Sequence, residues 1–174
     1  MNPAKSLVIS AILVFGSTLV IQAQSPSDRS QTQSNMRQLA LGSLAYAADY
    51  DLILPAATSS RSVAFCILPY ARSLDLWRPV GQVSGVTEFN LAMAGVDTNH
   101  VDITPTLVLF YQSKPDADGI RAVAQLDSAV KELSPAAWEK ASRDLKGKFP
   151  KGASRMLPRT WGFGQVPADF RSKK

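Results

Sequence analysis

Hydrophobic and polar positions along this chain fall into three patterns, and the first is an apolar run at the N-terminus. Leu7–Ile21 contains fifteen mostly apolar residues and no charged residue. This length fits the core of a signal peptide and falls short of the about 20 residues that cross a bilayer. Lys5 supplies the preceding positive charge, and Ala23 offers a cleavage point. We predict a signal peptide over 1–23, with an uncleaved N-terminal anchor that associates with the membrane through residues 7–21 as the alternative.

The second pattern is the stripe of an amphipathic helix. A polar stretch over 24–33 is interpreted as a linker. After it, apolar residues recur at the spacing of one helix face. We expect this helix to begin at Ser34 or Asn35, either of which can cap its first turn, and to end near Tyr50. The largest side chains of the stripe should lie buried against a sheet: Met36, Leu39 and Leu44.

The apolar block Arg61–Leu74 is ambiguous between a strand and a short amphipathic helix. Because Pro69 lacks the amide that a central strand needs, we favour a helix that begins near Ser62 and is ended or kinked at Pro69. Cys66, the only cysteine of the chain, lies in this block. It cannot form an internal disulfide, and its apolar neighbours favour a small buried core residue over an intermolecular disulfide.

The third pattern is typical of strands. Thr106–Gln112 is rich in β-branched and aromatic residues, and a shorter strand is expected within 83–89. Ile120–Leu126 and Ala129–Leu133 flank a two-residue turn, as the strands of a hairpin do. Ser134 and Pro135 then suit the start of a helix that continues to Leu145. The elements predict an α+β domain over 34–145, in which the N-terminal amphipathic helix packs on a small antiparallel sheet.

The composition offers few residues for catalysis. The chain has one histidine, His100, and one cysteine, so no structural zinc site and no histidine-based catalytic set can be assembled. His100 lies among polar residues and carboxylates and is interpreted as an exposed loop residue. No nucleophile elbow and no glycine-rich phosphate loop occurs. We therefore predict a protein that is not an enzyme.

One short motif suggests a metal. Asp116 and Asp118 lie in the sequence Asp-Ala-Asp-Gly, which begins like a calcium loop. The later acidic ligands of an EF-hand are missing, so a plain β-turn is the alternative. Calcium at these two carboxylates is the only cofactor that the sequence suggests.

The net charge of +5 originates in the C-terminal part of the chain. Lys140–Lys174 carries ten Lys and Arg against two Asp, and we treat 146–174 as a basic tail. Aromatic and basic side chains alternate there, as in proteins that bind single-stranded nucleic acid. The candidate residues for an anionic partner are Arg155, Arg159, Trp161, Phe163 and Arg171. A solvated or self-packed tail is the alternative, and nucleic acid is not the expected partner of an exported protein.

Three blocks of the chain stand in a recognisable order: Gln33–Pro55, Ile67–Pro79 and Phe89–Leu133. Together they resemble the pseudopilin-like secreted proteins of the type II secretion and type IV pilin-like group, whose C-terminal domain carries an H-x9-DG motif. The first block matches the family pattern in register at Ser34-Asn35, Gln38-Leu39, Tyr46, Asp49-Tyr50-Asp51 and Leu54-Pro55. The second block contains the family's Leu-Pro-Tyr at Leu68-Pro69-Tyr70.

The chain also departs from this family. Thr32 stands where the family has a cysteine, and the second common cysteine is missing near Trp77, which implies the loss of a disulfide. Ala117 replaces the signature histidine, and Ser128 replaces the glycine of Asp-Gly, so the motif is degenerate. No glutamate precedes Glu88, so processing and assembly in the manner of a prepilin are not expected.

The resemblance implies a detached pilin-like domain with an ordinary export signal. The expected function is that of a non-enzymatic structural or interaction protein of the cell envelope or secretion apparatus, with protein partners in the envelope or in a pilus-like assembly. Its expected location is periplasmic, extracellular or anchored in the inner membrane. The alternative is an exported binding module whose basic aromatic tail docks an anionic polymer, nucleic acid or lipid.

Overall fold

The computed structural model describes residues 25–82, 85–101 and 107–145. Its elements, in chain order, are α1 (Pro26–Asp49), α2 (Ser60–Ala71), β1 (Thr87–Phe89), β2 (Val108–Gln112), β3 (Arg121–Gln125), β4 (Val130–Leu133) and α3 (Pro135–Leu145). Three short 3-10 helices lie between them: η1 (Asp75–Trp77), η2 (Leu91–Met93) and η3 (Thr98–His100). The predicted α+β class is therefore confirmed. None of the helices in these ranges combines the length and the apolar character needed to cross a membrane.

Helix α1 begins earlier than its apolar stripe suggested. Ser25 caps it by accepting a hydrogen bond from the backbone amide of Asp28 at 3.2 Å, and the Asp28 carboxylate accepts one from the amide of Ser25 at 3.2 Å. Pro26 occupies the first helical position, where its missing N–H costs nothing. The prediction of a linker over 24–33 is therefore wrong from Ser25 onward, because Ser25 is the helix cap and residues 26–33 are helical. The predicted helix start at Ser34 or Asn35 is wrong for the same reason. The first turns of the helix are polar, so hydrophobic periodicity alone could not find them.

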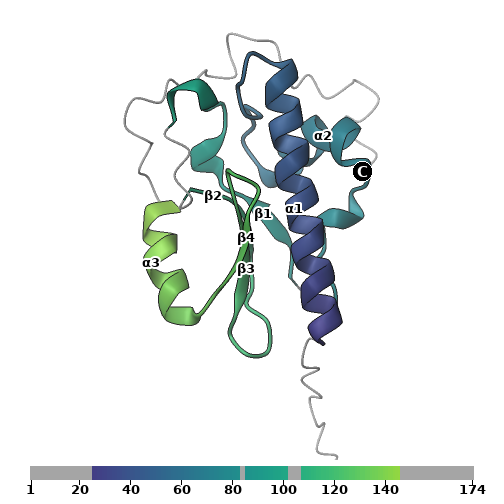
Figure 1. The fold of residues 1–174 in the computed structure, drawn as a ribbon, viewed down its shortest axis with the longest axis vertical. Helices are drawn as coiled ribbons and strands as arrows, with labels where there is room; N and C mark the ends of the chain where they lie inside the picture. The colour runs from purple at the N-terminus through teal and green to yellow at the C-terminus, as the bar shows by residue number, and fades with distance from the viewer. Residues whose placement is uncertain (1–24, 83–84, 102–106, 146–174) are drawn as a thin grey trace, which may run out of the picture.

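The four strands form one antiparallel sheet in the order β1-β2-β3-β4. Figure 1 shows this sheet between α1 on one side and α3 on the other. Because side chains alternate along a strand, each face has its own set. The inner face, toward α1, carries Phe89, Phe110, Gln112, Ala122, Ala124 and Val130. The outer face, toward α3, carries Glu88, Val108, Tyr111, Arg121, Val123, Gln125, Lys131 and Leu133.

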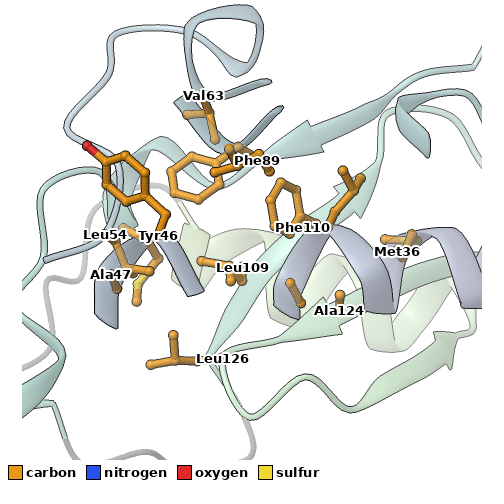
Figure 2. Packing of buried hydrophobic residues seen from close by; sticks show 14 of the residues in the cluster. Met36, Tyr46, Ala47, Leu54, Val63, Phe89, Leu109, Phe110, Ala124 and Leu126 are labelled. Atoms are coloured by element: carbon orange, nitrogen blue, oxygen red, sulfur yellow. The ribbon is translucent and has the colours of Figure 1, made fainter. Parts of the chain in front are cut away.

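The hydrophobic core lies between the inner face and α1. Met36 and Leu39 are fully buried there, as predicted, whereas Leu44 is only half-buried against the same core. Phe110 lies at the centre, with its ring edge-on to Phe89 at 5.3 Å and to Trp77 at 5.4 Å between centroids. Figure 2 shows Phe89, Phe110 and Met36 within this cluster. Edge-on aromatic pairs of this kind stabilise a core beyond their buried area.

The ambiguous second block is a helix, as favoured. Ser59 caps α2 by accepting a hydrogen bond from the Ser62 amide at 3.1 Å, and Pro69 lies inside the helix instead of ending it. The helix ends at Arg72, which takes a left-handed φ of 65°. Helix α2 packs along α1, where a Cβ added to Gly42 would lie 3.4 Å from Ala71. Cys66 is half-buried against the core, not fully buried as expected.

The strand predictions are confirmed with shorter bounds. The strand expected within 83–89 is β1, the β-branched run is β2, and the hairpin is β3 and β4. Ser128 holds the hairpin turn with a φ of 64°, and its amide donates to the carbonyl of Gln125 at 3.0 Å. A bulge between Val108 and Phe110 places Leu109 as an extra buried residue in β2. The short C-terminal helix is α3, and it covers the outer face.

Candidate functional site

The suggested calcium residues lie in the loop that joins β2 to β3. One carboxylate oxygen of Asp116 accepts hydrogen bonds from the amides of Asp118 at 3.0 Å and Ile120 at 2.8 Å. Its other oxygen lies 2.9 Å from the guanidinium of Arg29 on α1, and the Asp116 side chain is only 4% exposed. Gly119 adopts a φ of 78°, which a tight turn requires and glycine tolerates. The Asp116 carboxylate therefore stabilises the loop through hydrogen bonds to the loop's own backbone amides.

The single guanidinium of Arg29 lies against both carboxylates of this loop. Its guanidinium pairs with Asp116 and also with Asp118, and the hydrogen bond to Asp118 raises the pKa of Arg29. A cation bound by the two aspartates would compete with this guanidinium. In the part of the chain that the structure describes, no group of three or more acidic, histidine or cysteine side chains could hold a metal ion. Calcium binding at Asp116 and Asp118 stays a prediction, and the arrangement as it stands ties the start of α1 to the sheet.

A second polar cluster joins the end of α1 to α2. The hydroxyl of Tyr70 donates to the Asp49 carboxylate at 2.6 Å, and this hydrogen bond raises the pKa of Tyr70 to about 12. Tyr46 stacks on Tyr50 at 4.4 Å and meets Tyr70 edge-on at 6.1 Å. Burial raises the pKa of the Cys66 thiol nearby. Burial also raises the pKa of Tyr46. Each of the three raised pKa values, those of Tyr46, Cys66 and Tyr70, favours the neutral form of its group.

The outer face of the sheet carries the third cluster, around Trp138 of α3. Its ring lies 4.8 Å from the Arg121 guanidinium and 5.3 Å from the Tyr111 ring. The Tyr111 hydroxyl donates to Glu88 at 2.8 Å, and burial together with this bond raises the pKa of Tyr111 to about 12. Arg121 also donates to the carbonyl of Gln112 at 2.8 Å, and burial lowers its pKa. Trp138 thus anchors α3 to the sheet.

Two cavities, each half open to solvent, remain between α3 and the outer face. The larger has a volume of about 280 Å³ and lies between α3, the β2–β4 part of the sheet and η2. The other has a volume of about 260 Å³ and includes Glu88, Tyr111 and Trp138 in its wall. Sequence reasoning missed both cavities. The alternation of apolar and charged residues along β3 and β4 would have revealed an outer face, but not how incompletely α3 fills it.

Several predicted site residues lie outside the described residues. The signal segment 1–23 and the basic tail 146–174 are both outside, with all five candidate tail residues: Arg155, Arg159, Trp161, Phe163 and Arg171. The backbone of His100 ends η3, but its side chain is not among those described. The structure therefore brings together Asp116 and Asp118 alone among the predicted site residues, and it adds Arg29 to them.

No protein-family model, curated protein or solved structure matches this chain. The fold defines an α+β domain with a helix over each face of the sheet, and the clusters above join its elements through hydrogen bonds, ion pairs and ring contacts. A functional assignment therefore depends on the chain's own residues, on their packing and on the resemblance in the sequence.

Proposed function

We propose that this chain is an exported, pilin-like structural or interaction protein of the cell envelope or secretion apparatus, and that it is not an enzyme. The observation that carries the proposal is the meeting in space of residues from the three sequence blocks that resemble pseudopilin-like proteins. Asp49 of the first block accepts a hydrogen bond from Tyr70 of the second at 2.6 Å. Phe89 and Phe110 of the third block pack beside the first at the centre of the core.

Several of the positions matched in the first block are buried in this fold, which supports the resemblance. Leu39, Tyr46 and Leu54 belong to the core, and Asn35 is buried with its carboxamide oxygen accepting from Gln31 at 3.0 Å. These matched residues therefore contribute to the close packing of the domain.

The start of α1 favours a separate export signal rather than one long helix that runs from the apolar segment into the domain, as in a pilin. A capping box at Ser25 and Asp28, with Pro26 between them, gives α1 an N-terminus of its own two residues after the expected cleavage point at Ala23. A helix that continued without interruption from the apolar run Leu7–Ile21 would have no use for such a cap. The globular domain can therefore begin at the cap, whether the preceding segment is cleaved or stays as an anchor.

The environment of Cys66 does not activate it as a nucleophile. A reactive thiol usually has a lowered pKa, whereas burial raises the pKa of Cys66. The hydroxyls of Tyr70 and Tyr111 donate to the carboxylates of Asp49 and Glu88. These groups serve packing and hydrogen bonding, which is what a structural domain requires.

Photo-cross-linking in cells of the organism that encodes the chain tests the proposed role. A photoreactive amino acid would replace Leu41 on α1, which is 50% exposed, or Phe65 on α2, which is 36% exposed. The matched control is the exposed Ala136 on α3. We expect discrete adducts with identified envelope or secretion proteins from at least one of the first two positions. Adducts with cytoplasmic enzymes alone, or none from any position, would contradict the proposal.

A further inference from the structure

The larger cavity beneath α3 has the walls of a small-molecule site. Val123 and Leu133 of the sheet form one wall, and Ala137 and Ala141 of α3 form the other. Small alanine side chains on this helix face leave the space open, and Trp138 holds the helix over the sheet from the neighbouring side. Cavities that are mostly apolar and carry a few polar groups are the usual form of ligand sites.

The volume sets the size of a ligand. A cavity of about 150 Å³ accommodates benzene, so 280 Å³ has room for roughly a dozen non-hydrogen atoms. This is the size of a single medium-length alkyl chain with a small head group. A nucleotide or a peptide strand would lie largely outside it, because the cavity is half open to solvent and such ligands fill larger clefts.

The charges around the cavity set the chemistry of the head group. Lys131 of β4 and Lys140 of α3 both line the cavity, and its described lining contains no Asp or Glu. The adjoining 260 Å³ cavity instead includes Glu88 in its wall. Because a carboxylate is attracted by ammonium groups and repelled by another carboxylate, an anionic head group should lie on the lysine side.

We propose that this cavity binds a medium-chain aliphatic carboxylate, with its alkyl chain between α3 and the outer face of the sheet and its carboxylate at Lys140. The alkyl chain contacts Val123, Leu133 and Ala141, and the apolar surface that it buries provides most of the affinity. The Lys140 ammonium at the rim selects an anion over a neutral or cationic amphiphile. The site lies on the opposite side of the sheet from the clusters on α1, and Met93 of the core forms part of its wall.

Calorimetric titration of the full chain with decanoate, below the concentration at which decanoate forms micelles, tests the site. The matched ligands are 1-decanol and decyltrimethylammonium, which keep the alkyl chain and change the head group. We expect decanoate to bind with one-to-one stoichiometry, and at least tenfold more tightly than the cation. Equal binding of all three ligands, or no decanoate binding below millimolar concentration, would overturn the proposal.

Two pairs of variants locate the binding. Ala141→Phe fills the cavity and should weaken decanoate binding at least tenfold, whereas Ala136→Phe on the exposed side of α3 should leave it unchanged. Lys140→Gln should weaken decanoate several-fold without affecting 1-decanol, while Arg143→Gln on the same helix should affect neither ligand. Lys140 is exposed, so its variant keeps the test valid if Ala141→Phe fails to fold. Unchanged decanoate affinity in Lys140→Gln, or in a folded Ala141→Phe, would place the ligand elsewhere and refute the site.

Discussion

Replacing Phe110 by alanine should destabilise the domain more than a change at any exposed position. Phe110 is completely buried on the inner face of the sheet, and its ring meets both Phe89 and Trp77 edge-on. Removing a buried phenylalanine side chain costs about 3–5 kcal/mol, which includes the cavity that is left behind. Loss of two aromatic pairs, each contributing about 0.5–1.5 kcal/mol, places Phe110→Ala toward the upper end, at about 4–5 kcal/mol.

Urea unfolding followed by circular dichroism measures this loss. With a slope of about 2 kcal/mol per molar urea, the midpoint should fall by about 2 M. The control is Leu41→Ala on α1, which is half exposed and should change stability by less than about 0.5 kcal/mol. A loss below about 1 kcal/mol for Phe110→Ala, with an unchanged slope, would refute the packing of the inner face described above.

Three further predictions concern the helix ends and the tyrosines. Ser25→Ala removes the cap of α1 and should cost about 1 kcal/mol in urea unfolding, whereas no effect would mean that the helix starts later. Arg72→Gly relieves the left-handed backbone at the end of α2 and should raise the free energy of unfolding by up to about 1 kcal/mol, while Arg72→Ala should bring no such gain. Tyr70 and Tyr111 have pKa values raised to about 12 from about 10 in the unfolded chain, so the stability they contribute is complete below pH 10 and is lost as the pH rises toward 12. Between pH 9 and pH 12 the urea midpoint should therefore fall less in the double variant Tyr70→Phe, Tyr111→Phe than in the parent chain. An equal fall in both proteins would contradict the raised pKa values.

Local patterns in the sequence were sufficient for most of the elements. Thr106–Gln112, the hairpin around Asp127-Ser128 and the helix after Ser134 each combine residues of one propensity with clear boundary residues, so their type could be predicted. The end of α1 near Tyr50 follows from the same logic. The start of α1 was missed because its first turns carry no apolar stripe, although Ser25, Pro26 and Asp28 together form a helix-start signal.

The contacts between distant segments could not be predicted in this way. Arg29 pairs with Asp116 across most of the described chain, and no local spacing relates the two residues. The Asp-Ala-Asp-Gly motif suggested a metal ion. It could not reveal that the guanidinium of Arg29 lies next to these two carboxylates in the fold. The cavity beneath α3 depends in the same way on how Ala137 and Ala141 meet the sheet, which is a property of tertiary packing.

Subcellular fractionation with intact-mass analysis of the purified chain tests the central claim most directly. A C-terminally tagged chain would be expressed in its own organism, and cytoplasmic, envelope and secreted fractions would be compared. The proposed function predicts recovery outside the cytoplasm, with a mass that begins at Gln24 if the segment is cleaved, or with the full mass in the membrane fraction if it serves as an anchor. Recovery of the full-length chain in the cytoplasmic fraction alone would contradict the account.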